Sequence, residues 1–402
     1  MHHATDQTDL PAFPGARSQR CPFDPPEAYA GWRKAEGLQR VRLSNGGTGW
    51  VVSRYEDVRT VLADPRISAD ARRFPELRSN AEGKPDAFPR MDDPDHATVR
   101  RMLTSDFTVK RVTAMRPKIE EMANGFLEEM ISNGAPADLV RAYALPVPSL
   151  VISLLLGVPY TDHEFFQKHS STLISVTATT EERAAASAAL FGYLLDLVTR
   201  KEKDPGDDLI SRLLTDRVAT RELSREAVAM NSQILLLAGH ETTANMIALS
   251  TLTLLCHPEQ AARMCDTDDP AVIANAVEEL LRYLTISQNQ VNRIAAEDLT
   301  IGGQQLRAGD LLTVNLPAAN RDPSFLDHPD VLDITRDTRG HLAFGHGTHQ
   351  CLGQQLARAE VQIALPVLFR RLPGLRLAIP FEDVIFRHDM SVYGVHELPV
   401  SW

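Results

Sequence analysis

The longest helical segment that the sequence predicts runs from residue 224 to residue 256. Ser224 is a suitable N-cap, and Glu226 lies in the first turn, where a negative charge interacts favourably with the helix dipole. His240 and Glu241 interrupt this apolar segment, and no run reaches the roughly 18 uninterrupted apolar residues that a membrane span requires. We therefore predict that the chain folds around a long, buried central helix.

Helical periodicity also dominates the rest of the chain. The other predicted helices cover residues 55–62, 95–105, 112–132, 147–156, 162–174, 181–200, 206–215, 259–265, 270–284 and 352–371. Strand patterns are limited to a short run from Gly49, to residues 290–315 with a hairpin turn at Gly302-Gly303, and to the C-terminal stretches LRLAIP and SVYGVHELPV. We predict one mainly α domain over residues 1–402 with small sheets near one side, and an irregular N-terminal arm over residues 1–26.

Composition excludes several classes of protein. The 402 residues include 42 Lys and Arg against 53 Asp and Glu, and the resulting net charge of −11 argues against non-specific nucleic-acid binding. Four cysteines, none of them in a C-x-x-C pair, exclude a disulfide framework, a zinc ribbon and a thioredoxin motif. The N-terminus is polar and lacks the apolar region of a signal peptide, which predicts a cytoplasmic protein without a membrane anchor.

The strongest chemical signal lies in the segment FGHGTHQCLG, which runs from Phe344 to Gly353 and leads into a helix. A cysteine just before a helix N-terminus experiences the positive end of the helix dipole, which favours thiolate over thiol. The neighbouring glycines allow a flat group or a backbone to approach closely. A thiolate presented in this way suits a soft metal such as haem iron.

Two other interpretations of Cys351 stay open at this stage. A free cysteine is most often a small buried hydrophobic residue. His346 and His349 lie close to Cys351 in sequence and raise the alternative of a zinc site. A structural zinc site needs about four ligands, and the sequence offers no fourth ligand nearby.

The pattern F-x-x-G-x-x-x-C-x-G, formed here by Phe344, Gly347, Cys351 and Gly353, resembles the haem-binding signature of the cytochromes P450. The resemblance implies the P450 fold, a triangular-prism helical domain with haem b between the long central helix and the Cys-loop helix. It also implies that Cys351 is the axial thiolate ligand of the iron, which favours O–O cleavage.

A second motif supports the resemblance. Glu279 and Arg282 match the E-x-x-R motif of this family, whose ion pair helps to stabilise the Cys-loop side of the fold. Taken alone, a Glu/Arg pair at i,i+3 is common on exposed helix surfaces. The pair supports the resemblance because of its position, about seventy residues before the Cys loop.

A third motif lies within the long central helix. The run from Ala238 to Thr243 resembles A-G-x-[D/E]-T-T, in which Glu241 and Thr242 would deliver protons to bound dioxygen. Ala238 would lie against the cofactor, and Gly239 would thin the helix so that the cofactor and O2 can approach. The alternative is an ordinary buried threonine beside a glutamate that is paired with an arginine.

The propionates of haem need cationic donors. The resemblance implies that His96, Arg100, Arg293 and His349 supply them. Taken alone, His96 and Arg100 would be interpreted as a routine i,i+4 pair on a helix surface.

The resemblance also suggests where a substrate would bind. Its contacts would come from the 68–92 loop, helix 162–200, Leu237–Thr242, Thr285–Gln290 and Met390–Val395. Candidate lining residues are Phe88, Met91, Leu237, Ile286 and Val392, and their apolar character favours a lipophilic substrate. Polar contacts could come from Gln288, Asn289, Gln290, Arg72, Arg73 and Arg78. FGHGTHQCLGQQLAR and AGHETTA look closest to actinobacterial P450s that oxidise secondary metabolites and xenobiotics, which suggests a polyketide or macrolide-type substrate.

The chain lacks a P-loop or a dinucleotide-binding fingerprint, so electrons must come from another protein. The resemblance implies a ferredoxin and a ferredoxin reductase that uses NAD(P)H. Residues 100–118 carry six Lys and Arg against one acid, Asp106, and are either the docking site of an acidic ferredoxin or a solvated face.

We therefore predict a monomeric haem-thiolate monooxygenase that uses O2 as co-substrate and hydroxylates a small lipophilic molecule. One alternative keeps the haem but changes the reaction, to epoxidation, C–C coupling, xenobiotic oxidation or peroxide use. A second alternative is a non-catalytic binder of haem or small molecules. The Glu241–Thr242 pair disfavours this second alternative, because binding alone needs no proton delivery.

Overall fold

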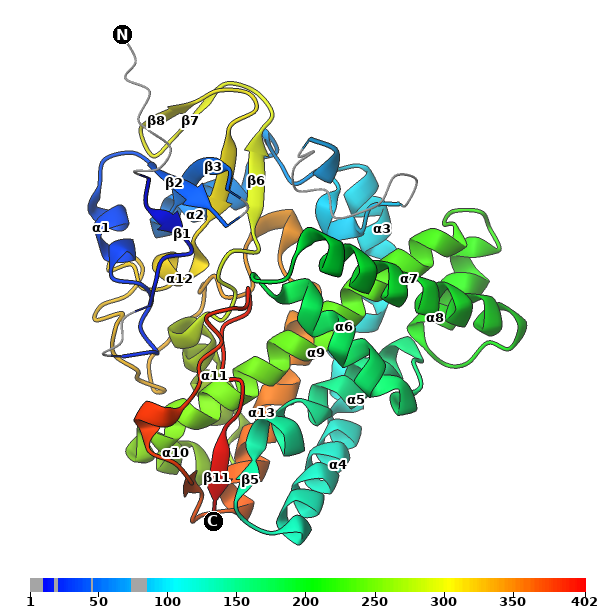
Figure 1. The fold of residues 1–402 in the computed structure, drawn as a ribbon, viewed down its shortest axis with the longest axis vertical. Helices are drawn as coiled ribbons and strands as arrows, with labels where there is room; N and C mark the ends of the chain where they lie inside the picture. The colour runs from blue at the N-terminus through cyan, green and yellow to red at the C-terminus, as the bar shows by residue number, and fades with distance from the viewer. Residues whose placement is uncertain (1–9, 18–20, 45, 74–84) are drawn as a thin grey trace. The chain divides into compact units, whose positions relative to one another are not determined.

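The computed structural model describes residues 10–17, 21–44, 46–73 and 85–402. The chain forms two compact units, and each is described by itself. Met1–Pro75 and Glu278–Cys351 form the first, here called the β-rich unit. Glu76–Val277 and Leu352–Trp402 form the second, here called the helical unit (Figure 1).

A six-stranded sheet with the order β1-β2-β3-β9-β6-β4 organises the β-rich unit. Its strands are β1 (Ala12–Phe13), β2 (Gln39–Leu43), β3 (Thr48–Val52), β4 (Ile67–Ser68), β6 (Asn292–Ala295) and β9 (Leu311–Val314). β3 pairs in parallel with β9, placing Trp50 opposite Leu312, whereas β6 is antiparallel to both β9 and β4. The sheet thus combines β1 to β4, from the N-terminal segment of this unit, with β6 and β9, from its second segment.

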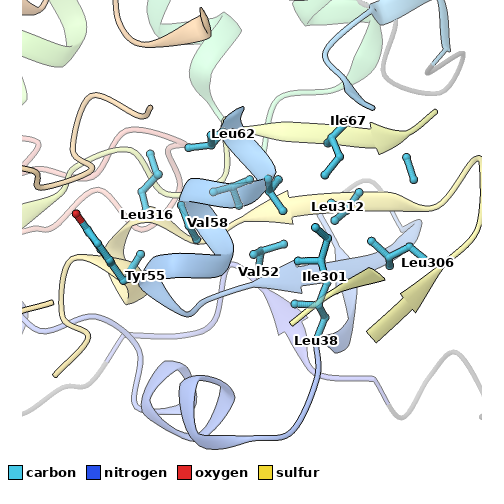
Figure 2. Packing of buried hydrophobic residues seen from close by; sticks show 14 of the residues in the cluster. Leu38, Val52, Tyr55, Val58, Leu62, Ile67, Ile301, Leu306, Leu312 and Leu316 are labelled. Atoms are coloured by element: carbon cyan, nitrogen blue, oxygen red, sulfur yellow. The ribbon is translucent and has the colours of Figure 1, made fainter. Parts of the chain in front are cut away.

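The hairpin predicted at Gly302-Gly303 is confirmed by β7 (Leu299–Ile301) and β8 (Gln304–Leu306). Both glycines have positive φ angles, +54° and +82°, a conformation that glycine adopts without steric cost. Beside the sheet, α2 (Tyr55–Ala63) presents Tyr55, Val58 and Leu62 to a core that includes Val52 and Leu312 of the strands (Figure 2). This unit also contains α1 (Ala28–Lys34), α12 (Leu316–Ala319) and the C-terminal part of α11 (Pro270–Leu284).

The helical unit is built around α9 (Arg225–Leu255), which confirms the predicted central helix. The Ser224 Oγ accepts a hydrogen bond from the Ala227 N–H at 3.1 Å, so the predicted N-cap is also correct. α9 packs against α5, α7 and α13, and Figure 1 shows it running through the middle of this unit. The other helices of the unit are α3 (Asp95–Thr104), α4 (Val109–Asn133), α5 (Pro146–Leu156), α6 (His163–Ile174), α7 (Thr180–Lys203), α8 (Leu209–Leu213), α10 (Pro258–Cys265), the N-terminal part of α11, and α13 (Gln354–Arg371).

A small sheet of β10 (Arg376–Leu377), β11 (Pro399–Ser401) and β5 (Ala137–Asp138) completes the helical unit. Among the residues that the structure describes, no helix is both long and apolar enough to cross a membrane.

The predicted helices are confirmed with ends that differ by three residues or fewer, and the difference is largest for helix 206–215, of which α8 covers only Leu209–Leu213. α8 begins only at Leu209, because the Asp208 Oδ1 accepts the Ser211 N–H at 2.9 Å and caps the helix there. A π-helical turn, Leu214–Val218, follows it. The predicted irregular arm also differs from the structure, because it contributes β1 to the sheet.

The C-terminal strand predicted over SVYGVHELPV is mostly wrong. Only Pro399 and Val400 of that run lie in a strand, β11. The preceding residues instead form a hairpin-like segment, with a bridge from Phe386 to Val395 and another from Met390 to Ser175 at the end of α6. Val392 and Val395 are apolar because this segment is buried within the helical unit, and not because they alternate on a sheet.

The 68–92 loop, from which substrate contacts are expected, is described only in part. Its described parts contain 3-10 turns at Ala71–Arg73 and Phe88–Arg90. Arg78 lies outside the described residues.

Candidate active site

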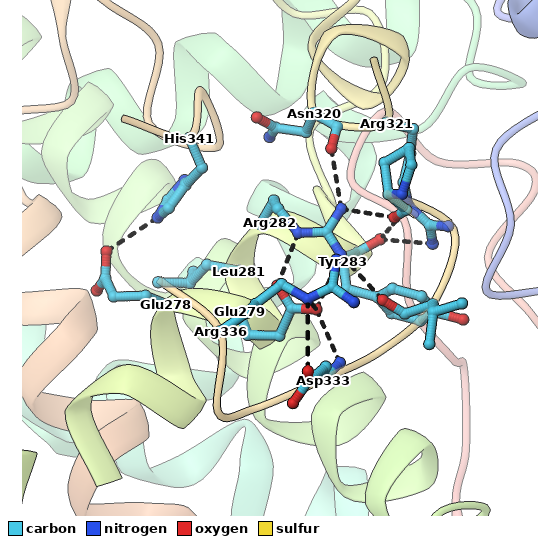
Figure 3. Close-up of polar contacts among 12 residues, drawn as sticks. Glu278, Glu279, Leu281, Arg282, Tyr283, Asn320, Arg321, Asp333, Arg336 and His341 are labelled. Atoms are coloured by element: carbon cyan, nitrogen blue, oxygen red, sulfur yellow. Dashed lines mark hydrogen bonds and ion pairs between the residues drawn. The ribbon is translucent and has the colours of Figure 1, made fainter. Parts of the chain in front are cut away.

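The E-x-x-R pair in the β-rich unit is completely buried. The Arg282 Nε and Nη2 donate to the two carboxylate oxygens of Glu279 at 2.7 and 2.9 Å, and neither side chain is exposed. The Arg282 Nη1 donates to the carbonyls of Asn320 and Pro329 at 2.9 and 2.7 Å (Figure 3). A pair that is fully buried and hydrogen-bonded in this way is not surface decoration of a helix.

This pair connects α11 to the chain that leads into the Cys loop. The Glu279 Oε1 also accepts the Asp333 N–H at 3.0 Å and lies 3.6 Å from the Arg336 Nε (Figure 3). The Asn320 side-chain oxygen accepts the Leu342 N–H at 2.6 Å, two residues before Phe344. The buried ion pair therefore anchors the segment from which the Cys loop starts.

The Cys loop is closed by its own backbone. The Cys351 N–H donates to the Phe344 carbonyl at 2.9 Å, and the Gln350 N–H donates to the Gly347 carbonyl at 3.1 Å, around a 3-10 turn over Gly347–His349. Cys351 is exposed, unlike the buried cysteine that composition alone would favour. A loop of this kind presents a sulfur atom outward, as a metal thiolate requires.

Gly347→Ala should destabilise the protein more than Gly345→Ala does. Both glycines have left-handed φ angles, +71° and +73°, so each alanine pays a backbone cost of about 1–2 kcal/mol. A Cβ at Gly347 would also lie 2.3 Å from the Leu62 carbonyl oxygen, whereas nothing lies within 4 Å of a Cβ at Gly345. Urea unfolding of both variants measures the difference, and equal losses would show that the close approach to Leu62 is unimportant.

In the helical unit, α9 has an open patch in the middle of a mostly buried helix. Ala238 is exposed and Leu237 and Thr242 are half-buried, whereas His240 and Glu241 are buried. The Thr242 Oγ1 donates to the Ala238 carbonyl at 2.7 Å, which leaves its lone pairs available on the open side. This patch therefore combines a small side chain with a hydroxyl.

The expected role of Gly239 is wrong. A Cβ at this position would lie 2.6 Å from the Ile152 side chain of α5. Gly239 thus allows α5 and α9 to pack closely, and the open side of α9 is formed by Ala238 instead.

The Glu241 carboxylate is buried and ion-paired. The Arg387 Nη1 donates to its Oε2 at 3.0 Å, and the exposed fractions of the two side chains are only 10% and 6%. Asn245 on the next turn donates to the Glu241 carbonyl at 2.7 Å. Pairing of this glutamate with an arginine is the alternative interpretation of the motif, but no local pattern identifies Arg387, which lies 146 residues away in the chain.

The candidate propionate-binding residues are divided between the units. His96 and Arg100 lie on α3 in the helical unit, and Arg293 on β6 and His349 in the Cys-loop turn lie in the β-rich unit. His96 is 1% exposed and its Nδ1 lies 3.1 Å from the Asp93 Oδ1, so it does not form a surface pair. His96 and Arg100 thus belong to the same unit as α9. Arg293 and His349 belong to the same unit as Cys351.

The candidate substrate-lining residues differ in exposure. Met91, Leu237 and Ile286 are half-buried, whereas Phe88 and Val392 are only 5% and 1% exposed. The Phe88 N–H donates to the Asn231 side chain of α9 at 3.0 Å. Phe88 and Val392 therefore have little surface for a ligand in this conformation, and ligand contact by the five residues stays a prediction.

The zinc alternative gains no support from the geometry. No group of three or more His, Cys, Asp or Glu in the described part of the chain is arranged to hold a metal ion. His346, His349 and Cys351 therefore do not form such a group. The donor chemistry of the Cys loop, an exposed thiol flanked by glycines at Gly345 and Gly347 with left-handed φ angles, fits haem iron.

The basic residues of 100–118 do not form one helix. Two of them lie on α3 and four on α4, and the 3-10 turn Ser105–Phe107 between the two helices carries none. Asp106 is buried and ion-paired with Arg212, so it does not offset the exposed charges. Arg101 and Lys110 are exposed and form no ion pair among the described residues.

Comparison with known proteins agrees with these features. The cytochrome P450 family model matches residues 40–373. Cytochrome P450-SU2 of Streptomyces griseolus is 50% identical, over 99% of this chain and 98% of that protein. The vitamin D3 dihydroxylase of the same organism is 47% identical, over 98% of each. The crystal structure of the mycinamicin VIII C21 methyl hydroxylase MycCI from Micromonospora griseorubida has a TM-score of 0.90 at 38% identity and covers 98% of this chain and all of that one. These matches confirm the mainly α fold with small sheets, and the chain belongs to the cytochrome P450 family of haem-iron monooxygenases.

Proposed function

We propose that this P450 is a ferredoxin-dependent hydroxylase of a lipophilic small molecule, and that it acts as a cytoplasmic monomer. The observation that carries the proposal is the open patch on α9, where the Thr242 hydroxyl lies beside exposed Ala238 and next in sequence to the buried Glu241 carboxylate. A binding protein has no need of such a pair, whereas an O2-using enzyme must deliver protons.

Cys351 would hold the iron of haem b, with Phe344, Gly347 and Gly353 shaping the loop around it. His96, Arg100, Arg293 and His349 would bind the propionates, and Ala238 would lie against the ring. Bound haem b supplies the activation of O2 and the transfer of one oxygen atom to a C–H bond.

The protein contributes the proton. Glu241 is the acid, held in place from one side by Arg387, and Thr242 is the alcohol that accepts and passes on a hydrogen bond. The Thr242 hydroxyl donates its hydrogen to the Ala238 carbonyl, so its oxygen keeps lone pairs that can accept a further hydrogen bond.

The substrate is lipophilic because the candidate lining residues are apolar. Phe88, Met91, Leu237, Ile286 and Val392 offer no charged partner. One relative is named for vitamin D3 and another for mycinamicin VIII, so family membership does not determine the substrate. We propose a polyketide or macrolide-type secondary metabolite, and ligand-induced spin-state shifts across a panel of metabolites test this.

The decisive test of haem ligation is the spectrum of the reduced protein under carbon monoxide. The proposal requires the strongly red-shifted Soret band of a thiolate-ligated haem. A band typical of histidine ligation, or a protein purified with zinc, would refute it.

Thr242→Ala should keep haem and substrate binding but divert electrons into hydrogen peroxide. Loss of one proton-delivery group is worth roughly 10²–10⁴-fold in rate, so product per NAD(P)H consumed should fall steeply. Thr243→Ala is the matched control, because Thr243 is buried and does not lie on the open patch. If Thr242→Ala forms as much product per NAD(P)H as the unmodified protein does, Thr242 has no part in proton delivery.

Charge reversal at Arg101 or Lys110 should slow reduction by ferredoxin at low salt. Both cations are exposed and form no ion pair among the described residues, so their loss removes attraction for an acidic partner without breaking an internal contact. Lys203→Glu, an exposed change on α7, is the control. Stopped-flow reduction rates at several salt concentrations make the comparison, and equal rates in all variants would place the docking site elsewhere.

A further inference from the structure

Arg387 is carried by a hairpin near the C-terminus, in the helical unit. Its N–H donates to the Gly394 carbonyl at 2.9 Å, next to the bridge between Phe386 and Val395. Residues 385–396, here called the Arg387 hairpin, are thus joined by backbone hydrogen bonds. These bonds fix the point from which the Arg387 side chain extends.

The Arg387 hairpin packs against α9 beside Glu241. A Cβ at Gly394 would lie 2.9 Å from the Asn245 Cβ, so the lack of a side chain there allows the hairpin to approach α9. The Asn245 Nδ2 donates to the Glu241 carbonyl at 2.7 Å. One strand of the hairpin therefore contacts α9 one turn after Glu241, and the other strand presents Arg387 to the carboxylate.

The ion pair between Arg387 and Glu241 depends on one close hydrogen bond. The Arg387 Nη1 donates to the Glu241 Oε2 at 3.0 Å, whereas the Arg387 Nε is buried and has no hydrogen-bond partner among the described residues. The Glu241 Oε1 lies 4.0 Å from the His240 Nε2, which is too far for a hydrogen bond. A shift of the guanidinium would therefore turn or release this carboxylate.

The tip of the Arg387 hairpin is attached to the end of α6. The Ser391 N–H donates to the Ile174 carbonyl at 2.9 Å, and the Val176 N–H donates to the Asp389 carbonyl at 2.8 Å. The end of α6 and the tip of the hairpin both belong to segments from which substrate contacts are expected. A single hairpin thus connects a candidate substrate-binding region to the buried acid of α9.

We propose that the Arg387 hairpin couples the end of α6 to proton delivery: its attachment to α6 keeps Arg387 on the Glu241 carboxylate, and a substrate that contacts both segments favours the attached state. This coupling rests on the proton-delivery role proposed above for Glu241. Arg387 acts through Glu241 and is a positioning residue. Its position matters because a misplacement of about 1 Å in an active site can cost roughly 10²-fold in rate.

The first measurement needs no turnover. Infrared difference spectra of haem-loaded protein with carbon-13-labelled glutamate compare the unmodified chain with Arg387→Met, which keeps a long side chain but removes the charge. A buried carboxylate without a counter-charge takes up a proton, so Arg387→Met should show a new protonated-carboxyl band at neutral pH. Burial lowers the pKa of His240, so this imidazole does not supply a replacement charge. The band should disappear in the double variant Arg387→Met/Glu241→Gln, which assigns it to Glu241.

Arg387→Lys is the conservative variant. Since one nitrogen of Arg387 makes the bond to Glu241, an ammonium can supply the same charge and a single bond. Arg387→Lys should therefore keep the carboxylate ionised, which a role of Arg387 in packing alone does not predict. If Arg387→Met shows no protonated-carboxyl band, Arg387 does not position Glu241.

A remote substitution tests the attachment to α6. Val176→Pro removes the N–H that donates to Asp389, and the preceding Ser175 already has the extended backbone, with φ −66° and ψ 133°, that a following proline favours. The protonated-carboxyl band should appear here too, at lower intensity than in Arg387→Met. Val176→Ala is the matched control, because it keeps the N–H and changes a side chain that is 38% exposed. Identical spectra for the two Val176 variants would overturn the coupling to α6.

A bound ligand tests the part played by the substrate. The probe is the metabolite that gives the largest spin-state shift in the panel described above. At saturation it should weaken the protonated-carboxyl band of Val176→Pro, because a ligand shifts a protein toward the state that it binds better. A band that does not respond would refute the effect of substrate on the hairpin.

Turnover of the same metabolite separates this coupling from the proton-delivery role itself. Arg387→Met should lose about tenfold in product per NAD(P)H, and Arg387→Lys should regain part of that loss. If Glu241→Gln forms as much product per NAD(P)H as the unmodified protein, the proton-delivery role is wrong. If Glu241→Gln loses product while Arg387→Met, folded and haem-loaded, matches the unmodified protein, only the role of Arg387 and its hairpin is wrong.

Discussion

Arg282→Ala should leave little folded protein. The substitution removes a guanidinium that makes two bonds to the Glu279 carboxylate and two bonds to backbone carbonyls, all at 2.7–2.9 Å in a fully buried site. It leaves the Glu279 carboxylate buried without its main counter-charge, and breaking a buried pair in this way costs about 3–5 kcal/mol. Because a folded domain is stable by only about 5–15 kcal/mol, soluble yield and the midpoint of urea unfolding should both fall sharply.

Lys118→Ala is the matched control for this prediction. Lys118 also forms an i,i+3 pair, with Glu121 at 2.8 Å, but the two side chains are 56% and 68% exposed. An exposed pair contributes about 0–1 kcal/mol, so this variant should unfold almost like the unmodified protein. Similar midpoints for the two variants would mean that burial of the E-x-x-R pair does not matter for stability.

Cys351→Ser should abolish the red-shifted carbon monoxide band completely. The serine hydroxyl is a hard ligand that stays protonated at neutral pH, so it cannot replace a soft thiolate at iron. The fold should survive, because the hydrogen bond that closes the loop comes from the backbone N–H of residue 351, which serine keeps. The measurements are the reduced carbon monoxide spectrum and far-UV circular dichroism on the same samples.

Cys256→Ser is the control, since Cys256 is also exposed but lies at the end of α9 outside the Cys loop. It should keep the full band. A band that persists in Cys351→Ser would assign the iron ligand to another residue.

Local sequence patterns were sufficient for much of the fold. Helical periodicity predicted the position of α9, and the Ser224 cap and the Gly302-Gly303 turn appear where their residue types indicated. These features depend on contacts between residues a few positions apart, which the sequence itself brings together. The same reasoning gave a wrong prediction for SVYGVHELPV. Its apolar residues are buried within the helical unit, and burial alone does not distinguish a strand from a loop.

The same distinction between local patterns and long-range contacts applies to the candidate site. The sequence by itself predicted which residues carry the chemistry, Cys351, Glu241 and Thr242, because short motifs place reactive groups next to glycines, helix ends and one another. Only the tertiary structure decided how those groups are held: that Glu279 and Arg282 are fully buried, that Gly239 faces Ile152, and that Arg387 and His240 flank the Glu241 carboxylate. The physical reason is that burial and ion pairing between residues 146 positions apart depend on which surfaces the folded chain brings into contact. No local pattern of residues encodes that information.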